Sequence, residues 1–318
     1  MSELEVYLGI DTSCYTTSVA FMDRQANLVG ESRQILKVHE GKCGLQQSEM
    51  VFQHTRNLPE MITNAMPRGA KIIGVCASGY PRPLPDSYMP AFLVGAGLAR
   101  SVSVLNNIPL WLISHQENHL LAGKWSAGGP DDERFLFLHA SGGTTDLLTA
   151  EKDGSGSYKL TEIGGSIDLH AGQFIDRIGV SLGLQFPAGQ ALEKFAGAAA
   201  GPVELPVSVK GCKASLSGPA TAAERKLAAG EDPAGIALGV QKVLAETFYR
   251  LIYNACSEYN TKSVLIAGGV ASNTYIREYL HNKLTGRKIS LWHPQARFSC
   301  DNASGCAAFA VLKGEKSV

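Results

Sequence analysis

Two histidines four residues apart are the clearest candidates for chemistry in this sequence. His115 and His119 follow the apolar segment Leu110–Ile113 and open an expected helix. Because residues i and i+4 lie on the same helical face, both imidazoles point to one side and could share a metal ion. The alternative is a strand-to-helix junction that carries two exposed histidines and no metal. Two histidines do not complete a metal site, so a further ligand must come from elsewhere in the chain.

Asp301 is the best third ligand. It stands in Ser299-Cys-Asp-Asn302, at the start of the last expected helix. An aspartate at this position would also serve as the helix N-cap, and capping alone would explain it equally well. His139, at the end of an apolar strand, could face the same cleft. A single histidine at a strand end is, however, more often a core or edge residue.

Three segments share the form of a buried strand that runs into a loop of small residues. They are Val6–Ser13, Phe135–Thr144 and Val264–Asn273. Small residues let a phosphate approach the main chain closely, and successive backbone amides form an anion-binding concavity. One such loop is explained equally well by a tight turn. Three of them, separated by helical stretches, favour a nucleotide site.

The elements around these loops predict a duplicated α/β fold. The first loop is followed by the expected strands Thr16–Met22 and Leu28–Leu36, and the second by Thr145–Ala150 and Tyr158–Ile163. Strand, loop, strand, strand and helix thus occur twice, which is the architecture of the actin-like ATPases. In that fold two lobes grip a nucleotide between paired phosphate loops. Helical periodicity predicts six helices: Ser48–Met66, Ala91–Asn107, Asp168–Leu182, Ala234–Glu258, Thr274–Leu284 and Asn302–Leu312.

The length of 318 residues allows two lobes with cores of their own. We place the boundary near Asn107–Pro109. Residues 1–108 would form the N-terminal lobe, and residues 109–301 the C-terminal lobe with the metal and nucleotide site. We expect the last helix, within 302–318, to pack back on the N-terminal lobe.

Composition and charge exclude several classes of protein. Seven cysteines without a Cys-x-x-Cys pair argue against a disulfide framework and a thiolate zinc site, so we expect reduced and mostly buried thiols. The N-terminal residues lack a signal-peptide pattern, and the longest apolar run, Pro90–Ala99, has about half of the roughly 20 residues that a membrane helix requires. We therefore expect a cytoplasmic protein without membrane contact.

The formal net charge is zero, with a pI near 7.1. The whole molecule therefore has no electrostatic footprint for non-specific nucleic-acid binding. Affinity for RNA would need a partner protein or a local cluster, for which the candidates are Lys210, Lys213, Arg225 and Lys226.

The order of the motifs resembles the TsaD-type threonylcarbamoyltransferases, a family formerly labelled glycoproteases. The motifs are His115-x-x-x-His119, Ser141-Gly-Gly, Ala267-Gly-Gly-Val-x-x-Asn273 and Asp301-Asn302, and the resemblance runs from Gly9 to about Ala310. It implies an acyltransferase of the actin-like (ASKHA) superfold that moves a threonylcarbamoyl group from threonylcarbamoyl-AMP to adenine of tRNA. It also implies a protein partner, either TsaB-like or a second copy of the chain.

The resemblance assigns roles to particular residues. His115, His119 and Asp301 match the ligands of one iron or zinc ion per subunit, and His139 stands where some members have a metal-binding tyrosine. Gly172–Arg177, Phe186–Glu193 and Ser215–Gly218 match further family segments. The implied contacts to ATP or threonylcarbamoyl-AMP are His139, Ala140, Ser141, Gly142, Gly143, Asp176, Gly189, Glu193 and Asn273. Asp176 and Glu193 suit ribose hydroxyls, because ionised carboxylates accept hydrogen bonds. Asp11 and Ser13 of the first loop are the candidate catalytic residues.

The sequence departs from the family pattern near the expected phosphates. Tyr15 and Thr16 replace two acidic residues, Gln173 replaces a glutamate and Arg177 replaces a lysine. A paralogue with a different carbamoyl acceptor, or a nucleotide-binding scaffold without turnover, is therefore an alternative. A metallopeptidase is disfavoured, because Gln116 occupies the place of the glutamate in His-Glu-x-x-His. A sugar or acetate kinase of the same superfold would have no use for the paired histidines.

Overall fold

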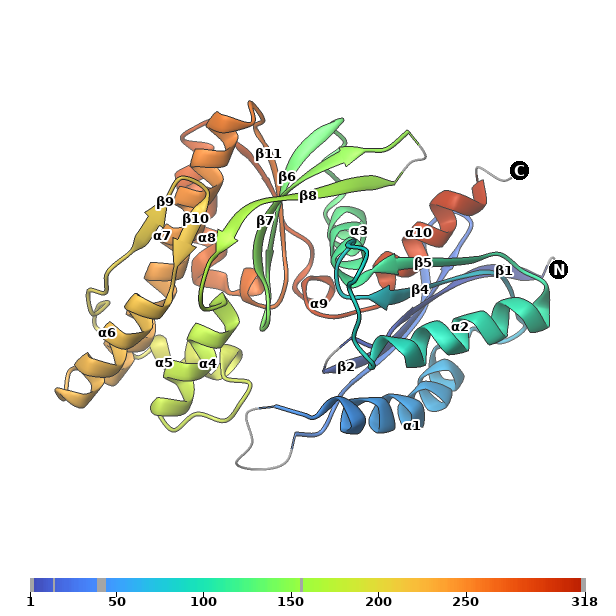
Figure 1. Ribbon diagram of the computed structural model, residues 1–318, viewed down its shortest axis with the longest axis horizontal. Helices are drawn as coiled ribbons and strands as arrows, with labels where there is room; N and C mark the ends of the chain where they lie inside the picture. Colours follow the sequence, from blue (N-terminus) through green and yellow to red (C-terminus); the bar gives the residue numbers. More distant parts are fainter. Residues whose placement is uncertain (1–2, 14, 39–43, 155–156, 316–318) are drawn as a thin grey trace. The chain divides into compact units, whose positions relative to one another are not determined.

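The computed structural model describes residues 3–13, 15–38, 44–154 and 157–315 of the chain (Figure 1). The chain forms two compact units. Unit 1 comprises Met1–Gly128, Lys152–Tyr158 and Arg297–Val318, and unit 2 comprises Gly129–Glu151 and Lys159–Ala296. Residues 109–128, which include the histidine pair, belong to unit 1. The predicted boundary near residue 108 concerns the two lobes that would hold a nucleotide, and it stays a prediction.

Unit 1 is built on a five-stranded sheet in the order β3-β2-β1-β4-β5. Three strands form an antiparallel meander, and two more run parallel to β1. The meander is β1 (Leu4–Asp11), β2 (Thr16–Asp23) and β3 (Leu28–Ile35), and the parallel strands are β4 (Ala70–Tyr80) and β5 (Leu110–Ser114). Most of β1 is buried, as expected for a central strand covered on both faces.

Helices cover both faces of this sheet (Figure 1). Val6, Leu8 and Ile10 of β1 join a core with α1 (Gln47–Ala65) and α2 (Phe92–Asn106). Side chains alternate between the two faces of a sheet, so Tyr7 and Gly9 of β1 face the opposite side, where α10 (Ser304–Gly314) packs. At Gly9 a Cβ atom would lie 2.4 Å from the carbonyl oxygen of Ala303. Only glycine therefore permits this close approach of the last helix. The helix α3 (His115–Ala127) contacts α10, β4 and β5.

Unit 2 is built on a seven-stranded sheet in the order β12-β11-β6-β7-β8-β10-β9. The strands β6 and β7 are antiparallel, and β11 and β12 run parallel to β6. The bounds are β6 (Arg134–Ala140), β7 (Thr145–Lys152), β8 (Tyr158–Ser166), β9 (Ser208–Lys210), β10 (Lys213–Ser215), β11 (Ser263–Ala267) and β12 (Ser290–Trp292). The order β8-β7-β6-β11-β12 repeats the order β3-β2-β1-β4-β5 of unit 1. The predicted duplicated α/β fold is thus confirmed.

The core of unit 2 surrounds the long helix α7 (Pro233–Glu258). Asp232 caps this helix by accepting from two backbone amides, and Pro233 stands in the first turn, where its missing N–H is harmless. The other helices are α4 (Ala171–Ser181), α5 (Gly189–Ala196), α6 (Ser217–Ala228) and α8 (Thr274–Thr285), with the short α9 (Ala296–Ser299) and a 3₁₀ turn at Val270–Ser272.

All six helices predicted from periodicity are present. The start of α4 was predicted too early, at Asp168 instead of Ala171. The carboxylate of Asp168 accepts hydrogen bonds from the Leu216 amide and two serine hydroxyls, and so anchors a turn in front of the helix. The prediction missed α5 and α6, whose sequences are short and begin within glycine- and proline-containing segments.

The cysteines that the structure describes are reduced and form no disulfides with one another, as expected. Cys76, Cys212, Cys256 and Cys306 are buried and Cys300 is exposed, whereas Cys14 and Cys43 lie outside the described residues, as do residues 316–318 of the last expected helix. Among the described helices, none combines the length and the apolar character that crossing a bilayer would need.

Candidate functional site

The start of α3 fixes the position of the histidine pair. Ser114 is the N-cap, and its hydroxyl accepts from the backbone amide of Glu117 at 3.1 Å. The Glu117 carboxylate in turn accepts from the backbone amide of Ser114 at 2.7 Å. This capping box begins the helix at His115, directly after β5. Both imidazoles therefore come from the first two turns of a well-anchored helix.

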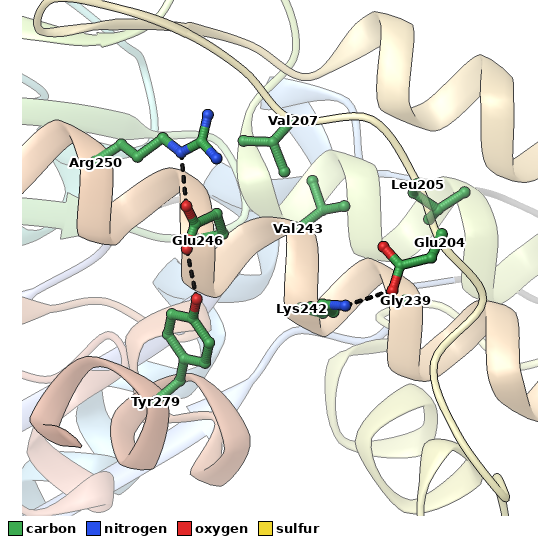
Figure 2. A pocket seen from close by; sticks show the side chains of 9 residues that line it. All are labelled: Glu204, Leu205, Val207, Gly239, Lys242, Val243, Glu246, Arg250 and Tyr279. Carbon is green, nitrogen blue, oxygen red and sulfur yellow. Dashed lines mark hydrogen bonds and ion pairs between the residues drawn. The ribbon is translucent and has the colours of Figure 1, made fainter. Parts of the chain in front are cut away.

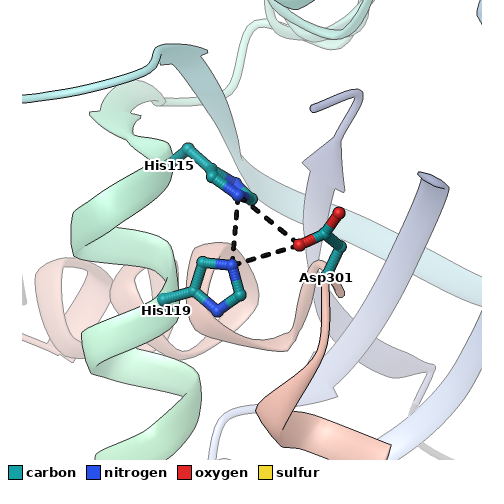
Figure 3. Close-up of side chains that lie close together, drawn as sticks. All are labelled: His115, His119 and Asp301. Carbon is teal, nitrogen blue, oxygen red and sulfur yellow. Dashed lines mark hydrogen bonds and ion pairs between the residues drawn. The ribbon is translucent and has the colours of Figure 1, made fainter. Parts of the chain in front are cut away.

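His115, His119 and Asp301 converge in unit 1 (Figure 3). The Nε2 atom of His119 lies 3.1 Å from Nε2 of His115 and 3.2 Å from Oδ1 of Asp301. The third side of the triangle, from His115 Nε2 to Asp301 Oδ1, measures 3.6 Å. The His119 ring is 1% exposed, whereas Asp301 keeps 25% of its side chain exposed. The structure thus brings the three expected ligands together.

The triangle has the dimensions of a metal site. An ion about 2.1 Å from each ligand atom separates neighbouring ligand atoms by about 3.0 Å in octahedral and about 3.4 Å in tetrahedral geometry. The three measured separations fall near this range. Two imidazole nitrogens and a carboxylate oxygen suit a borderline transition metal such as zinc or iron. The residues present therefore fit such an ion.

Burial and neighbouring groups have opposing effects on the pKa values of the three residues of the triangle. Burial disfavours a charged His115, but Asp11 and Asp301 together raise the pKa of His115 well above its usual range. Burial and the nearby His115 lower the pKa of His119. Burial opposes ionisation of Asp301, yet the hydrogen bonds of both histidines hold the pKa of its carboxyl well below its usual range. Asp11 and Asp301 thus attract positive charge to the rings, and a metal ion bound there would displace the proton of His115.

Asp11 and Ser13, the candidate catalytic residues, are fully buried behind His115. Oδ1 of Asp11 lies 3.2 Å from Nδ1 of His115. The Ser13 hydroxyl donates to Oδ2 of the same carboxylate at 2.7 Å. A carboxylate that accepts from Nδ1 fixes the tautomer and the ring orientation, so that Nε2 faces the ligand triangle.

A second buried contact holds the segment that carries Asp301. The Asn118 side chain donates to the carbonyl of Asn302 at 2.7 Å and accepts from the amide of Cys306 at 2.8 Å. The expected N-cap role of Asp301 was wrong, because α10 begins at Ser304 after Ala303. Asn302 instead accepts from the amide of Ser304 through its side chain. Asp301 is therefore left to face the histidines.

In unit 2 the Ser141–Thr144 loop packs against the start of α4. The amide of Gly172 donates to the carbonyl of Ser141 at 3.2 Å. A Cβ atom at Gly172 would lie 2.4 Å from Cα of Gly142, so the helix approaches the loop backbone as closely as it can. Gly142 and Gly143 are exposed. The loop thus presents small residues at a helix N-terminus, where an anion is stabilised.

The other expected nucleotide residues lie on α4, on α5 and at the start of α8 in unit 2. Asp176 accepts from the amide of Ala188, directly before Gly189, at 2.7 Å. Burial raises the pKa of this carboxyl, against the effect of that hydrogen bond. Glu193 accepts from the amide of Thr274 at 2.8 Å. Asn273 caps α8 through Oδ1 and donates to Gln241 at 2.9 Å.

His139 and Ala140 end β6 within unit 2. The His139 ring is 2% exposed and stacks on Phe137, with ring centroids 5.8 Å apart. Its strand neighbours are Ala267 of β11 and Asp146 of β7. The role of His139 as a metal or nucleotide ligand stays a prediction.

Sequence reasoning missed two residues that organise this region, Asn118 and Asp168. Asp168 accepts from the hydroxyls of Ser215 and Ser217 and from the amide of Leu216, which keeps the pKa of its carboxyl below its usual range although burial opposes this. The signal for Asp168 was the motif Ser215-Leu-Ser-Gly, whose hydroxyls need an acceptor. For Asn118 the only signal was a polar residue between the two histidines.

Several curated proteins resemble this chain over most of its length. The tRNA N6-adenosine threonylcarbamoyltransferase of Nitrosomonas eutropha is 28% identical over 96% of this chain and 91% of its own length. The protein of that name from Methanopyrus kandleri is 28% identical over 86% and 77%. A probable bifunctional tRNA threonylcarbamoyladenosine biosynthesis protein of Methanothermobacter thermautotrophicus is 26% identical over 96% of this chain and 55% of its own length.

Solved structures of low sequence identity share the fold. Component A of the (R)-2-hydroxyglutaryl-CoA dehydratase of Acidaminococcus fermentans has a TM-score of 0.57 at 17% identity, with 98% of this chain and 99% of that chain covered. HypF of T. kodakarensis gives 0.61 at 14%, covering 99% and 48%. A ROK family glucokinase of Streptomyces griseus gives 0.52 at 12%, covering 98% and 99%. The fold is that of the actin-like ATPases.

The sequence pattern of one protein family covers the histidine pair, the nucleotide segments and Asp301 together. The family described as TsaD, tRNA N6-adenosine threonylcarbamoyltransferase, matches residues 88–308, more than half of the chain. This range includes every candidate metal ligand named above. The chain therefore belongs to the TsaD family of tRNA N6-adenosine threonylcarbamoyltransferases.

Proposed function

We propose that this chain is a metal-dependent acyltransferase that moves a threonylcarbamoyl group from threonylcarbamoyl-AMP to adenine of tRNA. The observation that carries the proposal is the convergence of His115, His119 and Asp301 in a member of the TsaD family. A ligand triangle of these dimensions can hold the metal ion that such a transfer uses, and the duplicated fold supplies glycine loops that can bind the nucleotide phosphates.

The metal of the proposal is one iron or zinc ion per subunit, held by His115, His119 and Asp301, with His139 as a candidate fourth ligand. Bound there, the ion supplies Lewis-acid polarisation of an acyl oxygen. The chain's own part is to hold the ligands. Asp11 accepts from Nδ1 of His115, and Ser13 fixes the other oxygen of that carboxylate. We therefore assign both residues a positioning role behind the metal.

The nucleotide of the proposal, ATP or threonylcarbamoyl-AMP, binds in unit 2. The loop from Ala140 to Thr144 and the start of α4 receive its phosphates, because backbone amides and the helix dipole favour negative charge there. Asp176 and Glu193 each bind a backbone amide through one oxygen. A carboxylate has two acceptor oxygens, so each can also accept from a ribose hydroxyl. Gly189 and Asn273 lie beside them.

A second candidate function is transfer to a different carbamoyl acceptor. Tyr15 and Thr16 stand where the family pattern has acidic residues, and Gln173 replaces a glutamate. In the structure Gln173 accepts from the backbone amide of His170, at the start of α4. A neutral amide thus performs the capping there, and a negative charge is lost near the proposed phosphates. A nucleotide-binding scaffold without turnover would also tolerate this loss.

Peptidase activity finds no support at the histidine pair. A zincin needs a glutamate as general base directly after the first histidine. Here Gln116 occupies that position, and the Glu117 carboxylate binds the backbone amide and hydroxyl of Ser114. No acidic residue of the helix is therefore placed to activate a metal-bound water.

The proposal includes tRNA and a protein partner, TsaB-like or a second copy of the chain, in the cytoplasm. Of the basic residues expected to contact RNA, Lys210 and Lys213 are exposed and lie opposite each other on β9 and β10. Lys226 forms an ion pair with Glu231 at 2.8 Å, which reduces its charge toward a partner. A chain without net charge then binds tRNA weakly alone, with a steep dependence on salt.

The experiment is a transfer reaction with purified components. The chain, threonylcarbamoyl-AMP, tRNA and the host's partner proteins are incubated, and the nucleosides are analysed by mass spectrometry. Threonylcarbamoyladenosine that forms with the parent but not with the His115→Ala/His119→Ala variant supports the proposal. Tight binding of nucleotide and metal without product in the complete mixture would replace it with the second candidate.

A further inference from the structure

Four tyrosines and two cations form one connected cluster on the surface of α7 and α8 in unit 2. The tyrosine ladder is defined here as Tyr249, Tyr253, Tyr275, Tyr279, Lys283 and Arg287. The two helices pack against each other. Within each helix the ladder residues are four apart, at 249 and 253 in α7 and at 275, 279 and 283 in α8, so each set lies on one helical face. Arg287 follows directly after the C-cap of α8, Gly286.

The ladder is continuous through ring and cation contacts. The rings of Tyr275 and Tyr279 stack with centroids 6.3 Å apart, and those of Tyr249 and Tyr253 with centroids 5.9 Å apart. Lys283 joins the pairs, because its Nζ lies 5.5 Å from the Tyr279 ring and 5.6 Å from the Tyr249 ring. Arg287 covers Tyr253, with Cζ 5.2 Å from the ring centroid. The helical rise of 1.5 Å per residue makes the α8 part of this surface roughly 12 Å long over residues 275–283.

The ladder presents its cations outward, whereas Tyr249, Tyr275 and Tyr279 are partly buried against the core of unit 2. Leu251, Ile276 and Leu280 between the ladder positions are buried, whereas Lys283 and Arg287 are exposed and Tyr253 is 37% exposed. Among the described residues, neither Lys283 nor Arg287 forms an ion pair. Their charges are therefore held by tyrosine rings and remain available to an anion.

A pocket of about 230 Å³ continues the ladder beside Tyr279 (Figure 2). Its wall includes the apolar Leu205, Val207 and Val243, and its charged residues are paired. Glu204 forms an ion pair with Lys242 at 2.5 Å, and Glu246 forms one with Arg250 at 2.6 Å. Glu246 also accepts a hydrogen bond from the hydroxyl of Tyr279. Lys242, Arg250 and the Tyr279 hydroxyl thus engage these carboxylates, and the charge of Lys283 also acts on Glu246, whereas Arg287 lies farther along, over Tyr253.

We propose that the tyrosine ladder is the surface on which a single-stranded stretch of the RNA substrate docks. Phosphates contact Lys283 and Arg287, and a base stacks on the outer face of the Arg287 guanidinium, whose inner face covers Tyr253. Single-stranded RNA is bound by this combination of cations with aromatic rings and guanidinium planes. Because the chain has no net charge, a local surface of this kind is what RNA binding requires. The inference rests on the proposed function in tRNA modification.

The test compares two pairs of cations in the same unit. Lys283→Gln/Arg287→Gln removes the ladder charges, and Lys210→Gln/Lys213→Gln removes the same charge from the β9–β10 hairpin. Affinity for tRNA and for a single-stranded RNA oligonucleotide is measured by fluorescence anisotropy at several salt concentrations. The ladder variant should bind at least about tenfold more weakly at low salt. Its salt slope should fall by about 1.4, since each single-strand phosphate contact contributes roughly 0.7. The hairpin variant tests the other candidate for the main RNA contact, Lys210 and Lys213; it should lose less affinity than the ladder variant, and a larger loss would contradict the ladder.

A third variant, Tyr253→Leu, keeps the charge and removes one ring. It should weaken binding by at least about fivefold without a change in salt slope, because the ring that holds the Arg287 guanidinium in place for a stacked base is lost while both charges remain. Circular dichroism and the thermal unfolding midpoint establish that each variant is folded, and nucleotide affinity serves as an internal reference within unit 2.

Three results would overturn the inference. They are unchanged RNA affinity and slope in the ladder variant, a loss confined to the hairpin variant, and a ladder variant that loses a protein partner but keeps its RNA affinity. The transfer reaction is measured separately. If the parent catalyses the threonylcarbamoyl transfer but the ladder variants bind RNA normally, the inference about the ladder is wrong and the proposed function stands. If RNA binding depends on the ladder but no threonylcarbamoyl transfer occurs with the partner proteins present, the proposed function is wrong and the inference about the ladder stands.

Discussion

Asn118→Ala should destabilise unit 1 and loosen the candidate metal site together. Asn118 is fully buried on α3 between the two histidines, and it pairs with the carbonyl of Asn302 and the amide of Cys306. The variant leaves both backbone groups without these partners, at about 1–3 kcal/mol each. The free energy of unfolding should therefore fall by about 2–6 kcal/mol. Relaxation is restricted, because a Cβ at Gly305 would already lie 2.0 Å from the Asn118 carbonyl oxygen.

The metal consequence follows from the position of Asp301, one residue before Asn302. When residues that orient a ligand are removed, metal affinity typically falls 10–100-fold, and we expect a loss of about that size. Stability is measured by urea denaturation of the metal-free protein, and affinity by competition with a chelator. Asn254→Ala is the matched control, because it removes one hydrogen bond, to the carbonyl of Gly211, in unit 2. If Asn118→Ala stays within about 0.5 kcal/mol of the parent and binds metal equally well, the reasoning is refuted.

Three further predictions address the metal, the nucleotide and the pH dependence of stability. His115→Ala or His119→Ala should remove most bound metal and Asp301→Ala should weaken it, and unchanged elemental analysis of the double histidine variant would contradict the site. Asp176→Ala should bind ATP at least several-fold more weakly by calorimetry, since a hydrogen bond to a charged group contributes about 1.5–3 kcal/mol; equal affinity would reject this placement of the ribose. Burial lowers the pKa of His54 from 6.5 to about 4, against the effect of Asp11, so stability that is complete above pH 6.5 is lost as the pH falls through about 4. His54→Gln should remove about 3 kcal/mol of this acid-induced loss, as measured by urea denaturation from pH 7 to 4, and an unchanged pH profile would argue against the buried neutral ring.

The histidine pair and the duplicated fold could be predicted because both depend on local sequence. The spacing of His115 and His119 fixes their common helical face, and Glu117 completes a capping box that local residue types encode. The repeated meander is visible as two successions of apolar strands and small-residue loops. These features need no knowledge of contacts between distant segments.

The residues that hold the site together could not be predicted in the same way. Asn118 acts through Asn302 and Cys306, more than 180 positions later, and Asp168 acts through Ser215 and Ser217. Neither partner is determined by local periodicity. The N-cap expected of Asp301 failed for the same reason, because tertiary contacts of the Asp301–Ala303 turn decide which side chain caps α10.

The most direct test of the central claim is the modified nucleoside content of tRNA in cells. Mass spectrometry would be applied to tRNA from a strain that lacks this chain, and from that strain complemented with the parent or with His119→Ala. The account predicts that threonylcarbamoyladenosine falls in the deletion, returns with the parent and does not return with the variant. An unchanged level in the deletion, or full restoration by a variant shown to lack metal, would contradict it.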